Sequence, residues 1–332
     1  MILTSLIGLR ENTGGVKMDN FEGQDFIAES PAMKQVVLRA LRFAANEEFK
    51  VVSLFGPSGS GKNYLAKLIH RTSPRAQKSL VTVNCPEIPP SLREAELFGF
   101  ERGSFTNAFE SRDGYFQLAQ GSSIFLNEIC QTDVAFQRLL LGVFDEWKVR
   151  PIGKSKEIEL NIKVIVGSSK DLKQMVESKE FIEPLYYRIS AITIIIPPLC
   201  QRIEDIQPLA EYFIKKHNAG RIIEISQEAL AYLKAYAWPG NLRELDNEIQ
   251  RIIFDNLGLT IIRPEHLDRQ IREGVTLRAA QEVSMRFEKE HIARVLNATK
   301  GNIKRTAQIL DIPRTTLNSK IKRLDLTNFG RN

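Results

Sequence analysis

The sequence predicts an α/β fold with a mainly parallel sheet, followed by a helical subdomain and a C-terminal all-α domain. Short apolar runs alternate with helix-length segments up to about residue 198, and from there to residue 255 apolar residues recur at helical spacing. The balance of basic and acidic residues also changes along the chain. From Thr276 onward there are twelve Lys and Arg against five Asp and Glu, which leaves 34 and 35 of the chain's 46 and 40 for the preceding part.

The elements of the α/β part follow in order after a leader rich in Gly, Asn and Asp. Helical spacing begins near Pro31. Apolar runs between turn residues are typical of strands in a sheet covered on both faces. We expect helices over 62–72 and 132–147, and strands over 51–55, 80–84, 123–127, 162–168 and 192–196.

Composition excludes several classes of protein. A chain of 332 residues with 43% hydrophobic and 26% charged residues is typical of a soluble protein of two or three domains. No stretch approaches the roughly 20 apolar residues of a membrane helix, and the opening "MILTSLIGLR" has no basic residues before its apolar run. We therefore expect a cytoplasmic protein without a membrane partner. Cys85, Cys130 and Cys200 lack the spacing of a disulfide framework or a zinc site.

A glycine-rich loop lies between the first expected strand and the next helix. The stretch "GPSGSGKN" (56–63) fits the pattern G-x-x-x-x-G-K, in which backbone NH groups and the lysine bind phosphates. Asn63 stands where a magnesium-binding Ser or Thr is usual, which weakens the metal site without abolishing phosphate binding. The expected phosphate-binding residues are Gly56, Pro57, Ser58, Gly59, Ser60, Gly61, Lys62 and Asn63.

The strand 123–127 ends in Asn127, and Glu128 follows. In phosphoryl-transfer ATPases an acidic residue at the end of such a strand holds magnesium, and a neighbouring carboxylate orients the attacking water. Glu128 fits the second role. Asn127 offers an oxygen but no charge, so it predicts a weak Mg²⁺ ligand.

The basic tail predicts a DNA-binding domain. Ile303, Ala307 and Leu310 can form one apolar helix face, and Leu317, Ile321 and Leu324 another, with "DIP" as the turn between them. Arg and Asn suit base edges, and Lys suits phosphates. A solvated basic helix is the alternative. The expected DNA contacts are Arg314, Thr315, Thr316, Asn318, Ser319, Lys320, Lys322 and Arg323.

Five blocks in order resemble one family, the AAA+ activators of sigma-54 RNA polymerase. They are "IAESPAMKQV", "VNCPEIPPSLREAELFGFERGSFTNA", "LYYRISAITIIIPPLCQRIEDI", "WPGNLREL" and "GNIKRTAQILDIPRTTLNSKIKRL". The resemblance implies an AAA+ P-loop NTPase core, a helical lid and a Fis-type helix-turn-helix. It divides the chain into a leader (1–24), an α/β subdomain (25–198), a lid (199–267), a linker (268–278) and the DNA-binding domain (279–332).

The resemblance also implies roles for residues outside the phosphate loop. Glu128 would be the catalytic glutamate and Asn84 the residue that restrains it. Arg188 would reach the nucleotide of a neighbouring subunit in a ring, and Arg243 would be the sensor II arginine. The loop that contacts sigma-54 would be Gly103, Ser104, Phe105, Thr106, Asn107 and Ala108. ATP and Mg²⁺ are the implied cofactors, and enhancer-like upstream DNA is an implied partner.

Four positions depart from the family. Asn127 replaces an Asp, Ile182 replaces an arginine that reaches a neighbouring subunit, Ser169 stands at the sensor I Asn, and Asn107 replaces a glycine of the sigma-contacting loop. Loss of an arginine finger alone costs about 10³-fold in other NTPases. Slow or absent hydrolysis is therefore an open alternative to an ATP-driven activator.

Two further readings stay open. The protein can be a DNA-binding regulator that binds ATP without hydrolysing it, alone or as the partner of a catalytic paralogue. A replication or helicase-loading factor would leave the block "GSFTNA" unexplained. Because about 25 residues precede the α/β part, we expect control by a regulatory partner protein, by expression or by hetero-oligomers.

Overall fold

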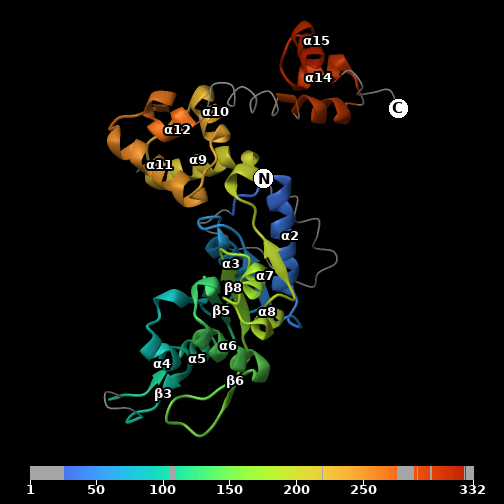
Figure 1. The fold of residues 1–332 in the computed structure, drawn as a ribbon. Coiled ribbons are helices and arrows are strands. Elements are labelled where there is room, and N and C mark those ends of the chain that lie inside the picture. Colours follow the sequence, from blue (N-terminus) through green and yellow to red (C-terminus); the bar gives the residue numbers. More distant parts are fainter. Residues whose placement is uncertain are drawn as a thin grey trace. The chain divides into compact units, whose positions relative to one another are not determined.

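The structure is a computed structural model that describes residues 26–104, 109–218, 220–274, 288–289, 291–299, 301–324 and 326 (Figure 1). The expected leader, residues 105–108 and the last part of the expected linker lie outside the described residues. The chain divides into two compact units. One reaches Asp205 and also takes in Pro239–Leu245, and the other comprises Ile206–Trp238 and the chain from Asp246 onward. The return of Pro239–Leu245 to the first unit is not anticipated by a linear division of the sequence.

The first unit is built on a five-stranded parallel sheet in the order β2-β5-β8-β1-β9. All five expected strands are confirmed. Because the strands are parallel, their carboxyl ends meet at one edge, where the phosphate loop and Glu128 begin. The strands are β1 (Val51–Phe55), β2 (Val81–Asn84), β5 (Ser123–Asn127), β8 (Lys163–Ser168) and β9 (Thr193–Ile195).

Alternating side chains of the central strands enter two separate cores. Phe125 and Ile165 pack with helices α2 (Pro31–Ala45) and α3 (Lys62–Arg71) on one face. The residues just before them, Ile124 and Val164, pack on the other face with α6, α7 and α8. Helices thus cover both faces of the sheet (Figure 1). Strands covered on both faces are continuously apolar, which is why these runs were recognisable in the sequence. The second set of helices is α6 (Val134–Glu146), α7 (Leu172–Glu177) and α8 (Glu183–Ile189).

Short elements connect the main ones, and the sequence did not predict them. Two of the added strand pairs are antiparallel and lie outside the main sheet. The first pair, β3 with β4, flanks the segment that contains residues 105–108. The short elements are η2 (Cys85–Glu87), η3 (Pro90–Leu92), α4 (Arg93–Phe98), β3 (Gly99–Phe100), β4 (Arg112–Asp113), α5 (Tyr115–Leu118), η4 (Ile129–Gln131), β6 (Lys148–Val149), β7 (Ile158–Glu159), η5 (Leu199–Gln201) and η6 (Ile203–Asp205).

The part of the chain from residue 206 to residue 255 is mainly helical, as expected. Residues 269–274, which we expected to belong to a linker, form the helix α12. Among the apolar residues that recur at helical spacing, Leu245, Ile249 and Ile252 are buried. A two-stranded parallel pair, β10 with β11, interrupts the helices. The elements are α9 (Ile206–His217), β10 (Glu224–Ile225), α10 (Gln227–Ala235), α11 (Asn241–Asp255), β11 (Ile261–Ile262), η7 (Pro264–His266) and α12 (Arg269–Gly274).

The C-terminal helices form their own apolar cluster. Residues 291–298 are helical, and α14 (Ile303–Ile309) and α15 (Arg314–Arg323) follow. The expected apolar faces are confirmed, since Ile303, Ala307, Leu310, Leu317, Ile321 and Leu324 all belong to this cluster. The side chain of Asn302 caps α14 by accepting a hydrogen bond from the NH of Arg305 at 3.1 Å.

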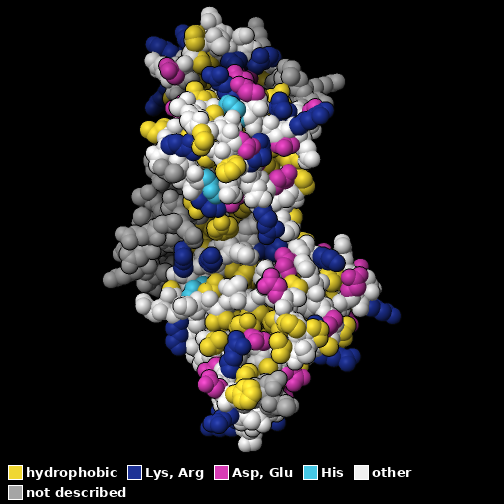
Figure 2. Space-filling view, turned by 90° about the vertical axis from the view of Figure 1, so that its left-hand side faces the viewer, with side chains coloured by type: hydrophobic (Ala, Val, Ile, Leu, Met, Phe, Trp, Pro, Cys, Tyr) yellow, Lys and Arg dark blue, Asp and Glu magenta, His cyan; other side chains and the backbone are white. Residues whose placement is uncertain are grey.

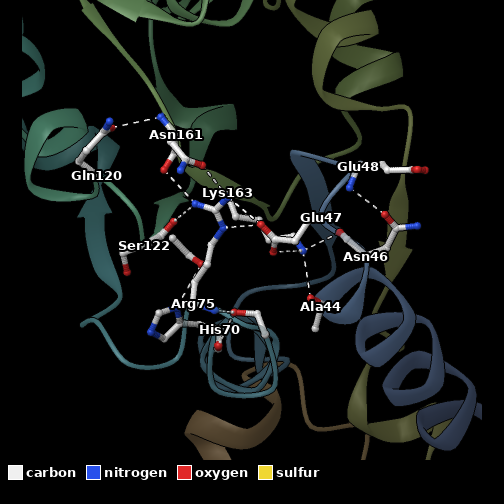
Figure 3. Close-up of polar contacts among 12 residues, drawn as sticks. Ala44, Asn46, Glu47, Glu48, His70, Arg75, Gln120, Ser122, Asn161 and Lys163 are labelled. Carbon is white, nitrogen blue, oxygen red and sulfur yellow. Dashed lines mark hydrogen bonds and ion pairs between the residues drawn. The ribbon is translucent and has the colours of Figure 1, made fainter. Parts of the chain in front are cut away.

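A buried polar network ties the amino edge of the sheet to the end of α2 (Figure 3). The ammonium of Lys163, 2% exposed, donates to the carbonyls of Phe43, Ala44 and Asn46 at 2.8, 3.1 and 2.8 Å. It also lies 3.6 Å from a carboxylate oxygen of Glu47. These carbonyls lie at the end of α2, where the NH of Asn46 also donates to the carbonyl of Phe43 at 3.3 Å. The lysine therefore adds donors to carbonyls that the helix itself leaves incompletely paired.

Arg75 completes this network. Its guanidinium binds the carboxylate of Glu47 at 2.9 and 2.7 Å and the backbone and side-chain oxygens of Asn161 at 2.8 Å each. Burial alone would raise the pKa of Glu47. The hydrogen bond from Arg75 and the charge of Lys163 outweigh it and hold the pKa below its usual value.

We expect Lys163→Ala to lower the free energy of unfolding by about 2–4 kcal/mol, because it removes the donor that three carbonyls at the end of α2 share and a positive charge beside Glu47. Lys156→Ala, at an exposed position, is the matched control and should change stability by less than about 0.5 kcal/mol. Urea unfolding followed by tryptophan fluorescence measures both. Equal midpoints for the two variants would contradict a stabilising role for the network.

Candidate functional site

The loop 56–63 joins the end of β1 to the first turn of α3. Gly59 and Gly61 have φ of 74° and 108°, values that L side chains rarely adopt. A Cβ at Gly59 would lie 2.3 Å from the carbonyl oxygen of Gly240. The loop therefore needs glycine at both positions, and it ends at the N-terminus of α3.

Lys62 is buried beneath this loop, with 5% of the residue exposed. Its ammonium donates to the carbonyls of Gly56 and Pro57 at 2.8 and 3.3 Å. It also lies 3.1 Å from Oε1 of Glu128. The structure thus brings together two residues that the sequence assigned separately to phosphate binding and to water activation.

Glu128 follows β5 with a backbone φ of 56°, which is unusual for a residue with a Cβ. Its Oε2 accepts hydrogen bonds from Oγ and the NH of Ser169, at 2.6 and 3.2 Å, and from Sγ of Cys130 at 3.4 Å. Burial alone would raise the pKa of Glu128, but the hydrogen bond from Ser169 and the charge of Lys62 outweigh it and hold the pKa below its usual value. The carboxylate is therefore ionised at neutral pH.

Asn84 and Asn127 are register partners on β2 and β5. Nδ2 of Asn127 donates to Oδ1 of Asn84 at 3.5 Å, a weak contact. Oδ1 of Asn127 is buried without a hydrogen-bond donor in the part of the chain that the structure describes. It packs against Gly167, where an added Cβ would lie 3.0 Å away.

The segment Pro239–Leu245 lies against the phosphate loop. Nη1 of Arg243 donates to Oγ of Ser58 at 3.2 Å, which places the predicted sensor II arginine beside the loop. Asn241, with a φ of 53°, donates from Nδ2 to the carbonyl of Ser58 at 3.0 Å and accepts the NH of Leu199 at 2.8 Å. Sequence reasoning missed Asn241, although its place inside "WPGNLREL" was a usable signal.

Arg202 is a second residue that sequence reasoning missed. It is 2% exposed, and its Nη2 donates to the carbonyl of Ser60 at 2.6 Å. Its place inside the block "LYYRISAITIIIPPLCQRIEDI" was a usable signal, but its burial under the phosphate loop depends on contacts 142 residues apart.

Arg188 and Ile182 lie on α8 and at its N-cap. Nε of Arg188 pairs with Asp145 at 2.6 Å, and both side chains are largely exposed. The structure therefore does not bring Arg188 to the loop 56–63 of its own chain. Ile182, where the family has an arginine, packs instead against the core beside α6 and α8.

Only part of the predicted sigma-contacting loop is described. Gly103 has a φ of 79° with open space around its Cα, and the NH of Ser104 donates to the carbonyl of Glu101 at 3.2 Å. Phe105, Thr106, Asn107 and Ala108 lie outside the described residues. Beyond them Phe109 is 77% exposed.

The N-terminal half of α15 presents a polar surface. Arg314, Thr315, Thr316, Asn318 and Ser319 are exposed, while Leu317 between them is buried. Figure 2 shows Lys and Arg side chains distributed over the face that it draws, with Asp and Glu side chains among them.

The other basic residues of α15 differ in their surroundings. Lys320 and Arg323 are both paired with Glu288 of the preceding helical segment. The side chain of Lys322 lies outside the described residues. Within the described chain, the exposed polar residues of α15 that are not paired with an acidic side chain therefore lie in the N-terminal half of the helix.

The sheet, the glycine loop with Lys62, and the carboxylate of Glu128 define a P-loop nucleotide-binding domain. Three family models match the chain: the sigma-54 interaction domain over residues 26–195, the AAA+ ATPase lid domain over 200–283, and the bacterial regulatory protein, Fis family, over 285–324. The chain belongs to the family of sigma-54-dependent transcriptional regulators with an AAA+ domain and a Fis-type DNA-binding domain.

Individual relatives agree with this assignment. The regulatory protein AtoC of Escherichia coli (strain K12) is 37% identical over 310 residues, which cover 89% of this chain and 67% of that protein. FlbD of Caulobacter vibrioides is 35% identical over 89% of this chain and 69% of its own length. The Nif-specific regulatory protein of Klebsiella pneumoniae is 38% identical over 69% of this chain, but the match covers only 44% of that protein.

Among solved structures, NtrX from Brucella abortus in complex with ADP matches with a TM-score of 0.68 at 30% identity. The match covers 97% of this chain and 72% of that one. The complex of the same protein with ATP matches with a TM-score of 0.67. The expected fold class is therefore confirmed. No helix in the described part of the chain is long and apolar enough to cross a membrane.

Proposed function

We propose that this protein binds ATP and Mg²⁺ at the loop 56–63, binds DNA through α15, and acts on sigma-54 RNA polymerase in the cytoplasm. The observation that carries the proposal is the convergence of Lys62, Glu128 and Arg243 on one loop. Lys62 suits the phosphates, Glu128 can activate water, and Arg243 can report the presence of nucleotide.

The residues of the loop fit a nucleotide. Gly59 and Gly61 leave the backbone open for phosphate oxygens, and the N-terminus of α3 favours negative charge. Lys62 already turns its ammonium toward the inside of the loop, where carbonyls and Glu128 hold it. Phosphate oxygens would compete with these partners for the same three donor protons.

The residues fit magnesium less well. Magnesium prefers hard oxygen ligands and usually takes one or two carboxylates. Asn127 offers the neutral Oδ1, which accepts no hydrogen bond from the described residues, and Asn63 is exposed. Glu128 is the nearby carboxylate. A bound Mg²⁺ would neutralise charge on the phosphates, and the chain supplies few negative ligands for it.

Action on sigma-54 follows from family membership and from the loop at residues 103–108. We propose that this loop contacts sigma-54 and that ATP binding in a self-associated ring moves it. In such a ring Arg188 would leave Asp145 and reach the nucleotide of a neighbouring subunit. The pair of Arg188 and Asp145 is exposed, so opening it costs about 1 kcal/mol or less.

DNA binding is proposed for the exposed half of α15. The arginine and asparagine of this half suit base edges, and its hydroxyl groups suit phosphates. The partner would be an enhancer-like site upstream of a promoter, read as two half-sites by a dimer. A regulatory partner protein remains part of the proposal as the source of the signal.

A second function is favoured by a specific observation. Asn127 carries no charge and pairs with Asn84, and Ile182, partly buried against the core, stands where an arginine would face a neighbour. These features suit a regulator that binds ATP as an assembly signal and does not hydrolyse it. Such a protein would still bind DNA, alone or with a catalytic paralogue.

Phosphate release by the purified protein separates the two functions. The activator predicts ATP hydrolysis that rises with sigma-54 polymerase and upstream DNA, and that Glu128→Gln abolishes while ATP still binds. The non-hydrolysing regulator predicts ATP and DNA binding with phosphate release equal to that of Glu128→Gln. Failure to bind ATP at millimolar concentration would contradict both.

A further inference from the structure

The two oxygens of the Glu128 carboxylate have different partners. Oε1 faces the ammonium of Lys62 at 3.1 Å. Oε2 faces Ser169, which donates both its hydroxyl at 2.6 Å and its NH at 3.2 Å. A carboxylate held at one oxygen by two donors from one residue has little freedom to rotate.

Asn84 points elsewhere. It is the register partner of Asn127 across β2 and β5, and its Oδ1 accepts from the amide of that residue. Glu128 comes one residue later, where the positive φ ends the strand and redirects the chain. Between Asn84 and Glu128 there is no hydrogen bond in the structure, although both are described.

Ser169 stands on a rigid support. It directly follows β8, a strand buried along its whole length. The hydroxyl of Ser168 donates to the carbonyl of Lys170 at 2.5 Å and so closes the turn around Ser169. This turn fixes the NH of Ser169, and a fixed donor loses little entropy when it binds.

The geometry points to Ser169 as the residue that positions Glu128, in place of Asn84, which the family resemblance singles out for contact with this glutamate. The inference rests on the proposed nucleotide function of the site. Oε2 is then the anchored oxygen. Among the described residues Oε1 is held by Lys62 alone, so it becomes available to water when Lys62 binds phosphates instead.

The position of the chain's departures supports this division of roles. Gly167 and Ser168 end β8, and Ser169 follows them. Gly167 leaves room for Oδ1 of Asn127, which would lie 3.0 Å from an added Cβ. The amide of Asn127 in turn donates to Oδ1 of Asn84. The end of β8 therefore lies against Asn127, and the residue that follows this strand supplies two donors to Glu128.

The titration of Glu128 tests the inference without any need for hydrolysis. Protein with ¹³C-labelled glutamate carboxyl groups is titrated free of nucleotide, and Glu128→Gln assigns the resonance. Loss of a hydrogen bond to the charged form disfavours that form. We therefore expect Ser169→Ala to shift the titration to higher pH, Ser169→Thr to restore it, and Asn84→Ala to leave it at the wild-type pH.

Hydrolysis gives a second readout. We expect Ser169→Ala to lower kcat about tenfold with KM changed less than about twofold, since one hydrogen bond to an ion is lost at the reacting group. In a plot of kcat against pH, the fall in rate on the acid side should move to higher pH. A base with a raised pKa becomes protonated at a higher pH when the solution is acidified. Ser169→Thr should recover both.

The outcomes separate this inference from the proposed function. An unchanged titration in Ser169→Ala, or an equal shift in Asn84→Ala, overturns the positioning role of Ser169. If the wild type releases no phosphate but Ser169→Ala shifts the titration of Glu128, then Ser169 positions Glu128 and the protein does not hydrolyse ATP.

Discussion

Lys62→Ala is expected to lower the affinity for ATP at least about 100-fold. In the structure the lysine is 5% exposed and its ammonium sits within the loop 56–63, so it has no alternative position in solvent. A buried ammonium that meets phosphate oxygens forms charge-assisted hydrogen bonds, and losing two or three of them removes several kcal/mol of binding. Titration with a fluorescent ATP analogue measures the change.

Lys67→Ala is the matched control for this variant. Lys67 lies on the same helix but is exposed, so its removal takes away the same charge without touching the loop. We expect its affinity to stay within about twofold of wild type. Because Lys62 also neutralises Glu128, the melting temperature of Lys62→Ala is measured as well. Equal ATP affinities for Lys62→Ala and wild type, in folded protein, would place the nucleotide outside this loop.

Much of the first unit could be predicted from local pattern. The strands β5 and β8 are continuously apolar because helices cover both faces, and such runs need no knowledge of distant residues. The phosphate loop was recognisable because strand, glycines and lysine are consecutive. In the C-terminal domain, Ala307 and Leu317 were identified by helical spacing, and both are buried as expected.

The rest of the site depends on contacts between distant residues. The hydroxyl of Ser169 meets Glu128 across 41 positions, and Asn241 meets Ser58 across 183. A sequence pattern shows that Ser169 departs from a family, but not that its hydroxyl reaches the carboxylate. Likewise Lys163 looked like an ordinary strand residue, and only the end of α2 beside it explains why a lysine is buried there.

Asn127→Asp is expected to raise the rate of magnesium-dependent ATP hydrolysis about 100-fold. The change keeps the shape of the side chain and adds a negative charge at the end of β5, where a metal ligand is needed. A metal held at the transferred phosphate lowers the barrier by several kcal/mol, and a carboxylate binds it more firmly than an amide does. Phosphate release as a function of Mg²⁺ concentration measures the effect.

The surroundings of Asn127 can accept this change. Its Oδ1 packs against Gly167, and the new carboxylate would meet the same surface. Asn84 now accepts from the amide of Asn127, and a turn of its own amide group would let it donate instead. The buried charge therefore gains one donor from Asn84 and the positive charge of any bound metal.

Asn127→Ala separates charge from space at this position. It removes the oxygen as well as the amide, so it should lower hydrolysis where Asn127→Asp raises it. If all three proteins released phosphate at one brisk rate, the amide would not limit catalysis and Glu128 with Lys62 would suffice. If none released phosphate while all bound ATP, the limit would lie elsewhere, for example at the contact with a neighbouring subunit that we propose for Arg188.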